Sequence, residues 1–221
     1  MPADRRAALF DMDGTLVDST YLHTVTWWEA FRQAGHHVPM AAIHRTVGMG
    51  ADHLIGHLLG PSRDRDRDAA LSAAHKTLFA EYWTRLVPLD GAADLLRACA
   101  RRGWEVVLAS SAGGAELSAM RTALDAEDAL TAVTGADDVE SSKPAPDLVK
   151  QALEESGTDP GRAVFVGDTV WDMKAGARAG VPCVGVLSGG YCRHELLNAG
   201  AQEVYEGPGD LLSQLDSSPF R

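Results

Sequence analysis

The sequence has few cysteines, no long apolar run and a shortage of positive charge. Its three cysteines (Cys99, Cys183 and Cys192) lie far apart and form no CxxC pair, which argues against a disulfide framework. No apolar stretch approaches the roughly 20 residues of a membrane span, and the N-terminal MPADRR leads directly into a predicted strand. We therefore expect a cytoplasmic protein with no membrane partner.

The excess of acidic over basic residues argues against polyanionic partners. Lysine and arginine number 20 against 31 acidic residues, for a net charge of −11. A nucleic-acid binder or a binder of anionic membranes usually carries the opposite balance, so neither is expected. An anionic substrate would have to be held by a few local donors. The 221 residues are enough for one good core and a smaller satellite domain.

The pattern of apolar residues predicts an α/β fold. Short apolar strands are expected at 7–10, 104–109, 132–134, 163–166, 181–187 and 203–205, with helices at 91–102, 113–124, 146–156, 172–179 and 193–199. This alternation is typical of a doubly wound parallel sheet with right-handed crossovers. Residues 20–87 contain only helical patterns. We therefore predict a core formed by 1–16 and 88–221, with a small all-helical domain, 17–87, inserted after the first strand.

The most informative segment is LFDMDGTLVDS, residues 9–19. Asp11 and Asp13 follow the first strand, at the edge of the sheet where α/β proteins bind ligands. Residues two apart on a strand point to the same side, so the two carboxylates repel each other unless a divalent cation, a proton or both neutralise them. Such an arrangement is typical of a phosphoryl-transfer site. Taken alone, a DxD is also a common turn former.

Two further polar clusters come before predicted helices. Ser110 and Ser111 are followed by glycines at a helix start, where hydroxyls and free N–H groups can bind a phosphate or simply cap the helix. Lys143 lies in a loop stiffened by Pro144 and Pro146, which gives this acidic protein one fixed positive charge. A surface lysine ahead of a proline-started helix would look the same.

The fourth cluster follows the strand at 163–166. Gly167 presents Asp168 at the strand end, and Asp172 lies four residues later, which predicts that both carboxylates share one helix face. Either aspartate could act as a cap. Together with Asp11 and Asp13, they complete an oxygen-rich site of the kind that magnesium prefers.

These four motifs, in this order, resemble those of the haloacid dehalogenase-like superfamily of hydrolases. The matching elements are DxDGTLxDS, the strand-end serine, Lys-Pro-x-Pro and GDTxxDMxAGxxAG, and the resemblance covers nearly the whole chain. Within the superfamily the chain is similar to the group of phosphoglycolate phosphatases and β-phosphoglucomutases. The resemblance implies a Rossmann-like core and a helical cap of the C1 type, residues 17–87, that closes over the site and selects the substrate.

The resemblance also implies a reaction. Asp11 would attack phosphorus to give an aspartyl-phosphate, and Asp13 would protonate the leaving alcohol and then activate water. Dehalogenases of the family lack an acid at the second position, so Asp13 favours phosphoester chemistry. The implied activity is a phosphomonoester hydrolase acting on a small phosphorylated metabolite, with no nucleic acid as partner.

The family pattern assigns a place to each candidate residue. It implies a Mg²⁺ ion bound by the Asp11 carboxylate, the Asp13 backbone carbonyl and the Asp168 carboxylate. The phosphoryl group would be bound by Ser110, Ser111 and Lys143, and by the backbone N–H groups of Met12 and Asp13. Thr15 would support the turn, and Asp172 would orient the metal shell or Lys143.

Several alternatives stay open at this point. A sugar phosphomutase of the β-phosphoglucomutase type would carry an arginine three residues after a glycine like Gly48, where this chain has Ala51. A non-enzymatic phosphate-binding protein also fits the motifs. A phosphorylatable receiver module fits less well, because receivers are shorter and lack the helical insertion. The substrate could be a two-carbon acid, a sugar phosphate or a nucleotide monophosphate, and the chain could be a monomer or a homodimer.

The helical block contains seven of the eight histidines. His53 and His57 have the i, i+4 spacing of a zinc pair, but with no third ligand and no HExxH, zinc is not expected. His23 and His44 are candidates to face the substrate. The tryptophans of the block are expected in its core (Trp27, Trp28 and Trp83).

Overall fold

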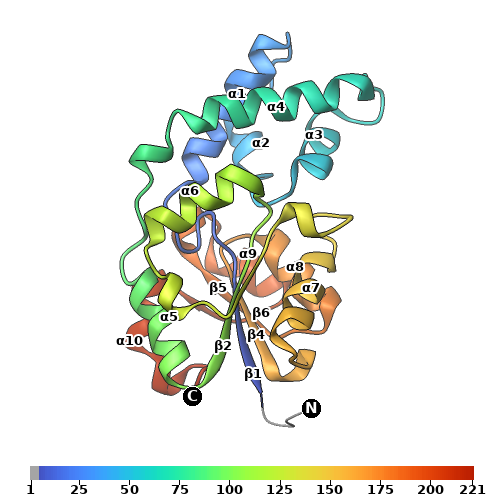
Figure 1. Ribbon diagram of the computed structural model, residues 1–221. Coiled ribbons are helices and arrows are strands. Elements are labelled where there is room, and N and C mark those ends of the chain that lie inside the picture. Colours follow the sequence, from blue (N-terminus) through green and yellow to red (C-terminus); the bar gives the residue numbers. More distant parts are fainter. Residues whose placement is uncertain (1–4) are drawn as a thin grey trace.

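The computed structural model describes residues 5–221, which form a six-stranded sheet with helices on both faces (Figure 1). The strands are β1 (Arg6–Phe10), β2 (Trp104–Ala109), β3 (Ala132–Thr134), β4 (Ala163–Gly167), β5 (Cys183–Val186) and β6 (Ala201–Tyr205). Neighbouring strands are parallel, in the order β3-β2-β1-β4-β5-β6. The strand order reverses beside β1, which is where open α/β sheets bind their ligands.

Each face of the sheet has its own core. Ala8 and Phe10 of β1 belong to one cluster of buried side chains, whereas Ala7 and Leu9 belong to the other. Successive residues of a strand face opposite sides, so residues 7–10 of β1 are all apolar because both faces of the strand are covered. The first face is covered by α5 (Ala92–Arg101), α6 (Gly114–Leu124) and α10 (Pro208–Ser213), and the second by α7 (Asp147–Ser156), α8 (Val170–Ala179) and α9 (Arg193–Ala199).

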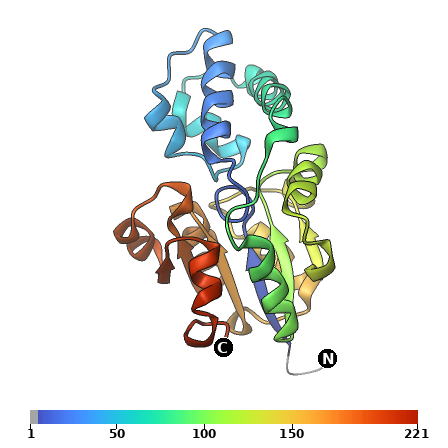
Figure 2. The ribbon, with the colours of Figure 1, turned by 90° about the vertical axis from the view of Figure 1, so that its left-hand side faces the viewer.

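The connection from β1 to β2 is helical, as predicted. Before α5, it contains α1 (Thr20–Gln33), α2 (Met40–His44), α3 (Ala51–Leu59) and α4 (Asp68–Ala80). Figure 2 shows these helices as a separate layer beyond the C-terminal ends of the strands. Trp27 belongs to their own buried cluster and Trp28 packs against it, whereas Trp83 packs against the core of the sheet. The expectation for Trp83 was therefore wrong, because α4 ends at Ala80 and the chain is already returning to the sheet.

The helix after β4 begins earlier than predicted, at Val170. Thr169 caps it, since its side-chain oxygen accepts hydrogen bonds from the N–H groups of Trp171 and Asp172. Asp168 therefore lies before the cap, and the prediction that it shares a helix face with Asp172 is wrong. The turn between β4 and α8 brings the two carboxylates close together instead. The short helix α10 was not predicted.

Two further expectations from the sequence concern the cysteines and membrane-spanning segments. Cys99, Cys183 and Cys192 are all free thiols, and Cys183 is buried in β5 as expected. Within residues 5–221, none of the helices has both the length and the apolar character needed to span a membrane.

Candidate active site

The four predicted polar clusters meet at the C-terminal edge of the sheet. Asp11 directly follows β1, and its N–H donates to the carbonyl of Val166 at 2.9 Å, so it is held to β4 as the strand residues before it are. Asp168 follows β4, Ser110 follows β2, and Lys143 comes from the loop before α7. Parallel strands end at a common edge, which is why residues more than 100 positions apart become neighbours.

Lys143 is fully buried and lies between two carboxylates. Its Nζ is 2.6 Å from Asp11 Oδ1 and 2.7 Å from Asp172 Oδ1. Burial alone would lower the pKa of Lys143, but the two aspartates raise it, so the side chain is a cation at neutral pH. Asp172 is itself positioned by the N–H and hydroxyl of Thr169, which both donate to its Oδ2.

Three buried aspartates form an oxygen-rich cluster. Asp11, Asp168 and Asp172 each offer a carboxylate oxygen, and these oxygens lie within 4.8 Å of one another. Burial raises the pKa of Asp11 to about 7 against the lowering effect of Lys143, and burial also raises the pKa of Asp168 well above its usual value. In the described part of the chain, Asp11 Oδ2 and Asp168 Oδ2 are buried without a hydrogen-bond partner. Two carboxyl oxygens without a partner, in groups whose negative charge burial disfavours, fit a hard divalent cation such as Mg²⁺, which would stabilise that charge.

Glycines form the wall around Asp168. A Cβ atom on Gly189 would lie 1.7 Å from Asp168 Oδ2, and one on Gly14, which has a φ of +73°, would lie 2.5 Å from the same atom. Thr15 donates from its hydroxyl to the other oxygen, Oδ1, at 2.9 Å. Thr15 therefore holds Asp168 in place, while the two glycines allow the backbone to approach the oxygen that has no partner.

The Asp13 carboxylate faces a different set of partners. It accepts hydrogen bonds from Ser19 and from His23, whose Nε2 lies 2.8 Å away, and His23 Nδ1 lies 3.1 Å from Nε2 of His75. Burial alone would raise the pKa of Asp13, but His23 holds it below its usual value. Conversely, burial would lower the pKa of His23, but Asp13 raises it. Burial and the neighbouring His23 keep His75 neutral, because they lower its pKa. His23 therefore lies between Asp13, which raises its pKa, and His75, whose own pKa is lowered.

The two candidate serines have different surroundings. Ser110 is fully buried, and its Oγ accepts a hydrogen bond from the N–H of Ala112, which stabilises the turn. Ser111 lines the pocket above the sheet edge. The side chain of Met12 is buried in the core, so only its backbone is available to a ligand.

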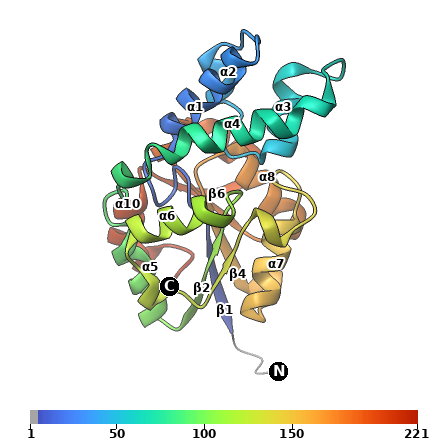
Figure 3. The same ribbon diagram turned by 45° about the horizontal axis from the view of Figure 1, so that its top comes forward.

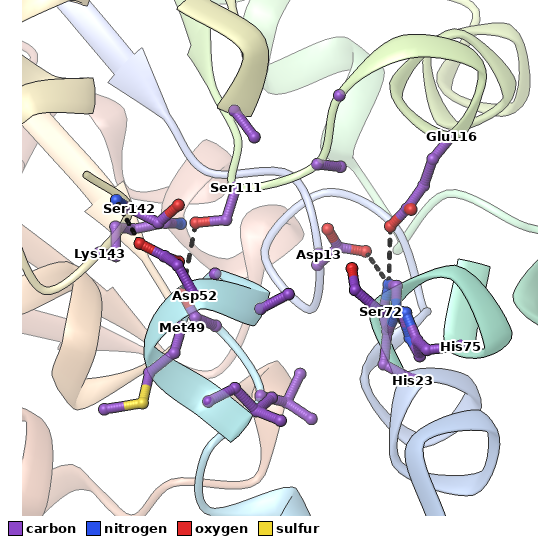
Figure 4. A pocket seen from close by; sticks show the side chains of 18 of the residues that line it. Asp13, His23, Met49, Asp52, Ser72, His75, Ser111, Glu116, Ser142 and Lys143 are labelled. Atoms are coloured by element: carbon purple, nitrogen blue, oxygen red, sulfur yellow. Dashed lines mark hydrogen bonds and ion pairs between the residues drawn. The ribbon is translucent and has the colours of Figure 1, made fainter. Parts of the chain in front are cut away.

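The pocket encloses about 290 Å³ and lies between the sheet edge and the helices of residues 20–80. Figure 3 shows α4 passing above α6 on this side of the sheet. In Figure 4, Asp13, His23 and Glu116 lie on one side of the pocket, and Ser111 and Lys143 lie on the other. Both the sheet and the helical layer therefore contribute polar groups to one small cavity.

The other histidines named from the sequence have separate partners. His44 bonds the carbonyl of Gly189 at 2.9 Å and lies outside the pocket that His23 lines. His53 bonds Ser141 at 3.0 Å, and the ring of His57 packs edge-on against Trp171. Sequence reasoning missed Ser19, His75 and Glu116. Ser19 contacts Asp13, while His75 and Glu116 both lie beside His23.

Comparison with known proteins agrees with this geometry. The family model described as "haloacid dehalogenase-like hydrolase" matches residues 5–180. A phosphoglycolate phosphatase from Rhodospirillum rubrum is 31% identical over 91% of this chain and 87% of its own length. An N-acetylmuramic acid 6-phosphate phosphatase from Pseudomonas aeruginosa is 32% identical over 96% and 95%. The crystal structure of a hydrolase from Pseudomonas syringae has a TM-score of 0.92 and 33% identity, covering 96% of this chain and 99% of its own. The chain therefore belongs to the haloacid dehalogenase-like hydrolases, and it groups with the phosphatases of that family.

Proposed function

We propose that this protein is a magnesium-dependent phosphomonoester hydrolase that acts on a small phosphorylated metabolite through an aspartyl-phosphate. The observation that carries the proposal is the position of Asp11. One of its oxygens is 2.6 Å from the Lys143 cation, and the other is buried without a partner beside Asp168. A carboxylate held in this way can approach a phosphate dianion only where positive charge screens the two.

The steps use two carboxylates with separate surroundings. Asp11 forms a bond to phosphorus while the ester P–O bond breaks, and the leaving oxygen takes, through Asp13, the proton that Asp13 shares with His23 in their hydrogen bond. Asp13 then takes a proton from water, whose oxygen attacks the aspartyl-phosphate, so that phosphate leaves and Asp11 is restored. His23, which is 2.8 Å from Asp13, holds the proton-transfer group in place.

The metal would be held by the carboxylates of Asp11 and Asp168 and by the backbone carbonyl of Asp13. When bound, it supplies positive charge that screens Asp11 from the phosphoryl group. Lys143 would contact a phosphoryl oxygen, with Ser111 lining the same pocket. The Ser110 hydroxyl, which accepts from the N–H of Ala112, would donate its proton to a phosphoryl oxygen, while Thr15 and Asp172 support the side chains around this centre.

Residues 17–87 would act as the cap that selects the substrate. Their helices have a buried cluster of their own, and they contribute His23, His75 and Asp52 to the pocket lining. Closing this layer over the sheet edge would exclude water until the aspartyl-phosphate has formed.

Hydrolysis fits the pocket better than phosphomutase chemistry. A mutase that works through a bisphosphate has to bind a second phosphate group away from the nucleophile. Ala51 lies in the pocket wall at the start of α3, at the position where the mutase pattern has an arginine, and no arginine lines this pocket in residues 5–221.

Metal dependence is the first test of the proposal. We expect EDTA to abolish phosphate release from p-nitrophenyl phosphate, and added Mg²⁺ to restore it. Asp168→Asn removes a proposed ligand, so the Mg²⁺ concentration for half-maximal activity should rise by about 100-fold or more. Mg²⁺ should also raise the Tm of the wild type and not that of Asp168→Asn, because only a bound ion stabilises the folded state. Full activity in EDTA would contradict the proposal.

Asp13→Asn separates the two chemical steps. p-Nitrophenolate leaves without being protonated, so we expect a rapid burst of about one equivalent, followed by turnover that is slower than wild type by about 10²-fold. With an alkyl phosphate the burst should disappear, because that leaving group needs the proton. Stopped-flow absorbance and acid-quenched mass spectrometry measure the burst and the covalent intermediate. Equal losses on both substrates, without a burst, would rule out Asp13 as the proton donor.

A further inference from the structure

The pocket that receives the substrate is rich in carboxylates beyond those that the proposed reaction needs. Glu116, Asp52 and Glu140 line it in addition to Asp11 and Asp13. Besides His23, which is paired with Asp13, its lining includes two lysines, Lys143 and Lys76, and no arginine among the residues that the structure describes. Lys143 is already paired with two aspartates, which leaves the exposed Lys76 as the lysine that could face the body of a substrate.

Glu116 lies deepest of the three additional carboxylates. It extends from α6 toward the Asp13–His23 pair, as Figure 4 shows, and its side chain is 11% exposed. Its Oε1 is 3.8 Å from His23 Nε2. Burial raises the pKa of Glu116, while His23 and Lys76 oppose that effect.

A second anionic group on the substrate would have to enter this acidic space. Like charges a few ångströms apart in a partly buried site repel strongly. Hydroxyl and ammonium groups, in contrast, can donate hydrogen bonds to Glu116, Asp52 and Glu140, because a carboxylate only accepts them. A cavity of about 290 Å³ lies at the small end of the range for metabolite sites, which fits a single sugar or amino alcohol.

We propose that the substrate is a phosphomonoester of a neutral or cationic polyhydroxyl or amino compound, such as a sugar or an amino sugar, and not of a second acid. This rests on the proposed phosphatase function and specifies its substrate class. The chain would accordingly discriminate against phosphoglycolate, although a relative that is 31% identical is named for that substrate.

The test compares kcat/KM within pairs of substrates that differ in charge and little in size. We expect glucose 6-phosphate and glucosamine 6-phosphate to exceed 6-phosphogluconate, and phosphoethanolamine to exceed phosphoglycolate, each by about tenfold or more. Equal or higher values for the two acids would overturn the inference. Hydrolysis of p-nitrophenyl phosphate, run in parallel, reports the phosphatase function separately. If no ester at all is hydrolysed, the proposed function itself fails.

A variant then locates the source of the discrimination. Glu116→Gln removes the charge and keeps the shape, so each pairwise ratio, normalised to p-nitrophenyl phosphate, should fall by roughly 3–10-fold. Glu154→Gln is the matched control, because this exposed residue of α7 carries the same charge outside the pocket, and its ratios should equal the wild type. Ratios unchanged in Glu116→Gln, or shifted equally in both variants, would remove Glu116 from the explanation.

Discussion

Asp11→Asn should lower phosphate release by about 10⁴-fold or more, since an amide cannot replace the carboxylate as a nucleophile. The variant should still fold. Asparagine has nearly the same shape, and Lys143 keeps its partner Asp172 at 2.7 Å. Burial raises the pKa of Asp11 to about 7, so removing its charge also relieves repulsion within the aspartate cluster. We therefore expect the Tm in EDTA to equal or exceed that of the wild type.

Three measurements together make this result specific. Phosphate release gives the loss of turnover, thermal unfolding confirms the fold, and mass spectrometry after acid quenching looks for the phosphorylated protein. Asp94→Asn, an exposed aspartate on α5, serves as the matched control and should retain wild-type turnover. If Asp11→Asn still forms a phosphoenzyme, the nucleophile is another residue.

Lys143→Met should reduce both stability and activity. Methionine can fill the space of the lysine stem, but Asp11 and Asp172 then lose the cation that lies 2.6 and 2.7 Å from them. Removing one partner of a buried ion pair costs about 3 kcal/mol or more, which lowers the Tm of a chain of this size by roughly 6–12 °C. Activity should fall by on the order of 10²-fold or more, because in the proposed reaction Lys143 also screens the phosphoryl group.

The stability measurement is made by thermal or urea unfolding in EDTA, so that a bound cation does not replace the missing charge. Lys150→Met, on the exposed side of α7, makes the same change away from the site and should alter stability by less than about 0.5 kcal/mol. Equal stability of the two variants would show that the Lys143 ion pairs contribute nothing to the fold.

The site residues that the sequence predicted are those that follow a strand. Apolar runs such as 7–10 and 163–166 identify the strands, and in a parallel sheet their C-terminal ends must share an edge. The sequence alone therefore predicts that Asp11 and Asp168 lie close together. Lys143 lies in the loop between β3 and α7, and the loop that follows a parallel strand lies at the same edge of the sheet. Its position near Asp11 and Asp168 could be predicted for this reason.

Contacts between helices could not be predicted in the same way. His75 is 52 residues from His23, and the two rings meet only because α1 packs against α4. The spacing of Leu71, His75 and Phe79 indicates the buried face of α4, but spacing does not reveal which residue lies opposite. Glu116 is a similar case, since its position depends on how α6 lies beneath the helical layer.

Two local details had readable signals. Thr169 and Asp172 form the T-x-x-D pattern of a capping box, which would have placed Asp168 outside the helix. Pro208 after Gly207 is a typical helix start and would have indicated α10. Which of Ser110 and Ser111 faces the pocket depends on side-chain direction in a turn, and the sequence does not determine that direction.

A single residue, Met12, separates Asp11 and Asp13, the two proposed catalytic groups, which are held by different parts of the fold. Asp11 is attached to the sheet through its hydrogen bond to Val166, so the proposed nucleophile moves with the sheet. The Asp13 carboxylate is attached to Ser19 and His23, at the base of the helical layer. A hinge motion of that layer would carry the partners of Asp13 with it and leave Asp11 in place. The moment at which a proton can move would then be set by the same motion that admits the substrate.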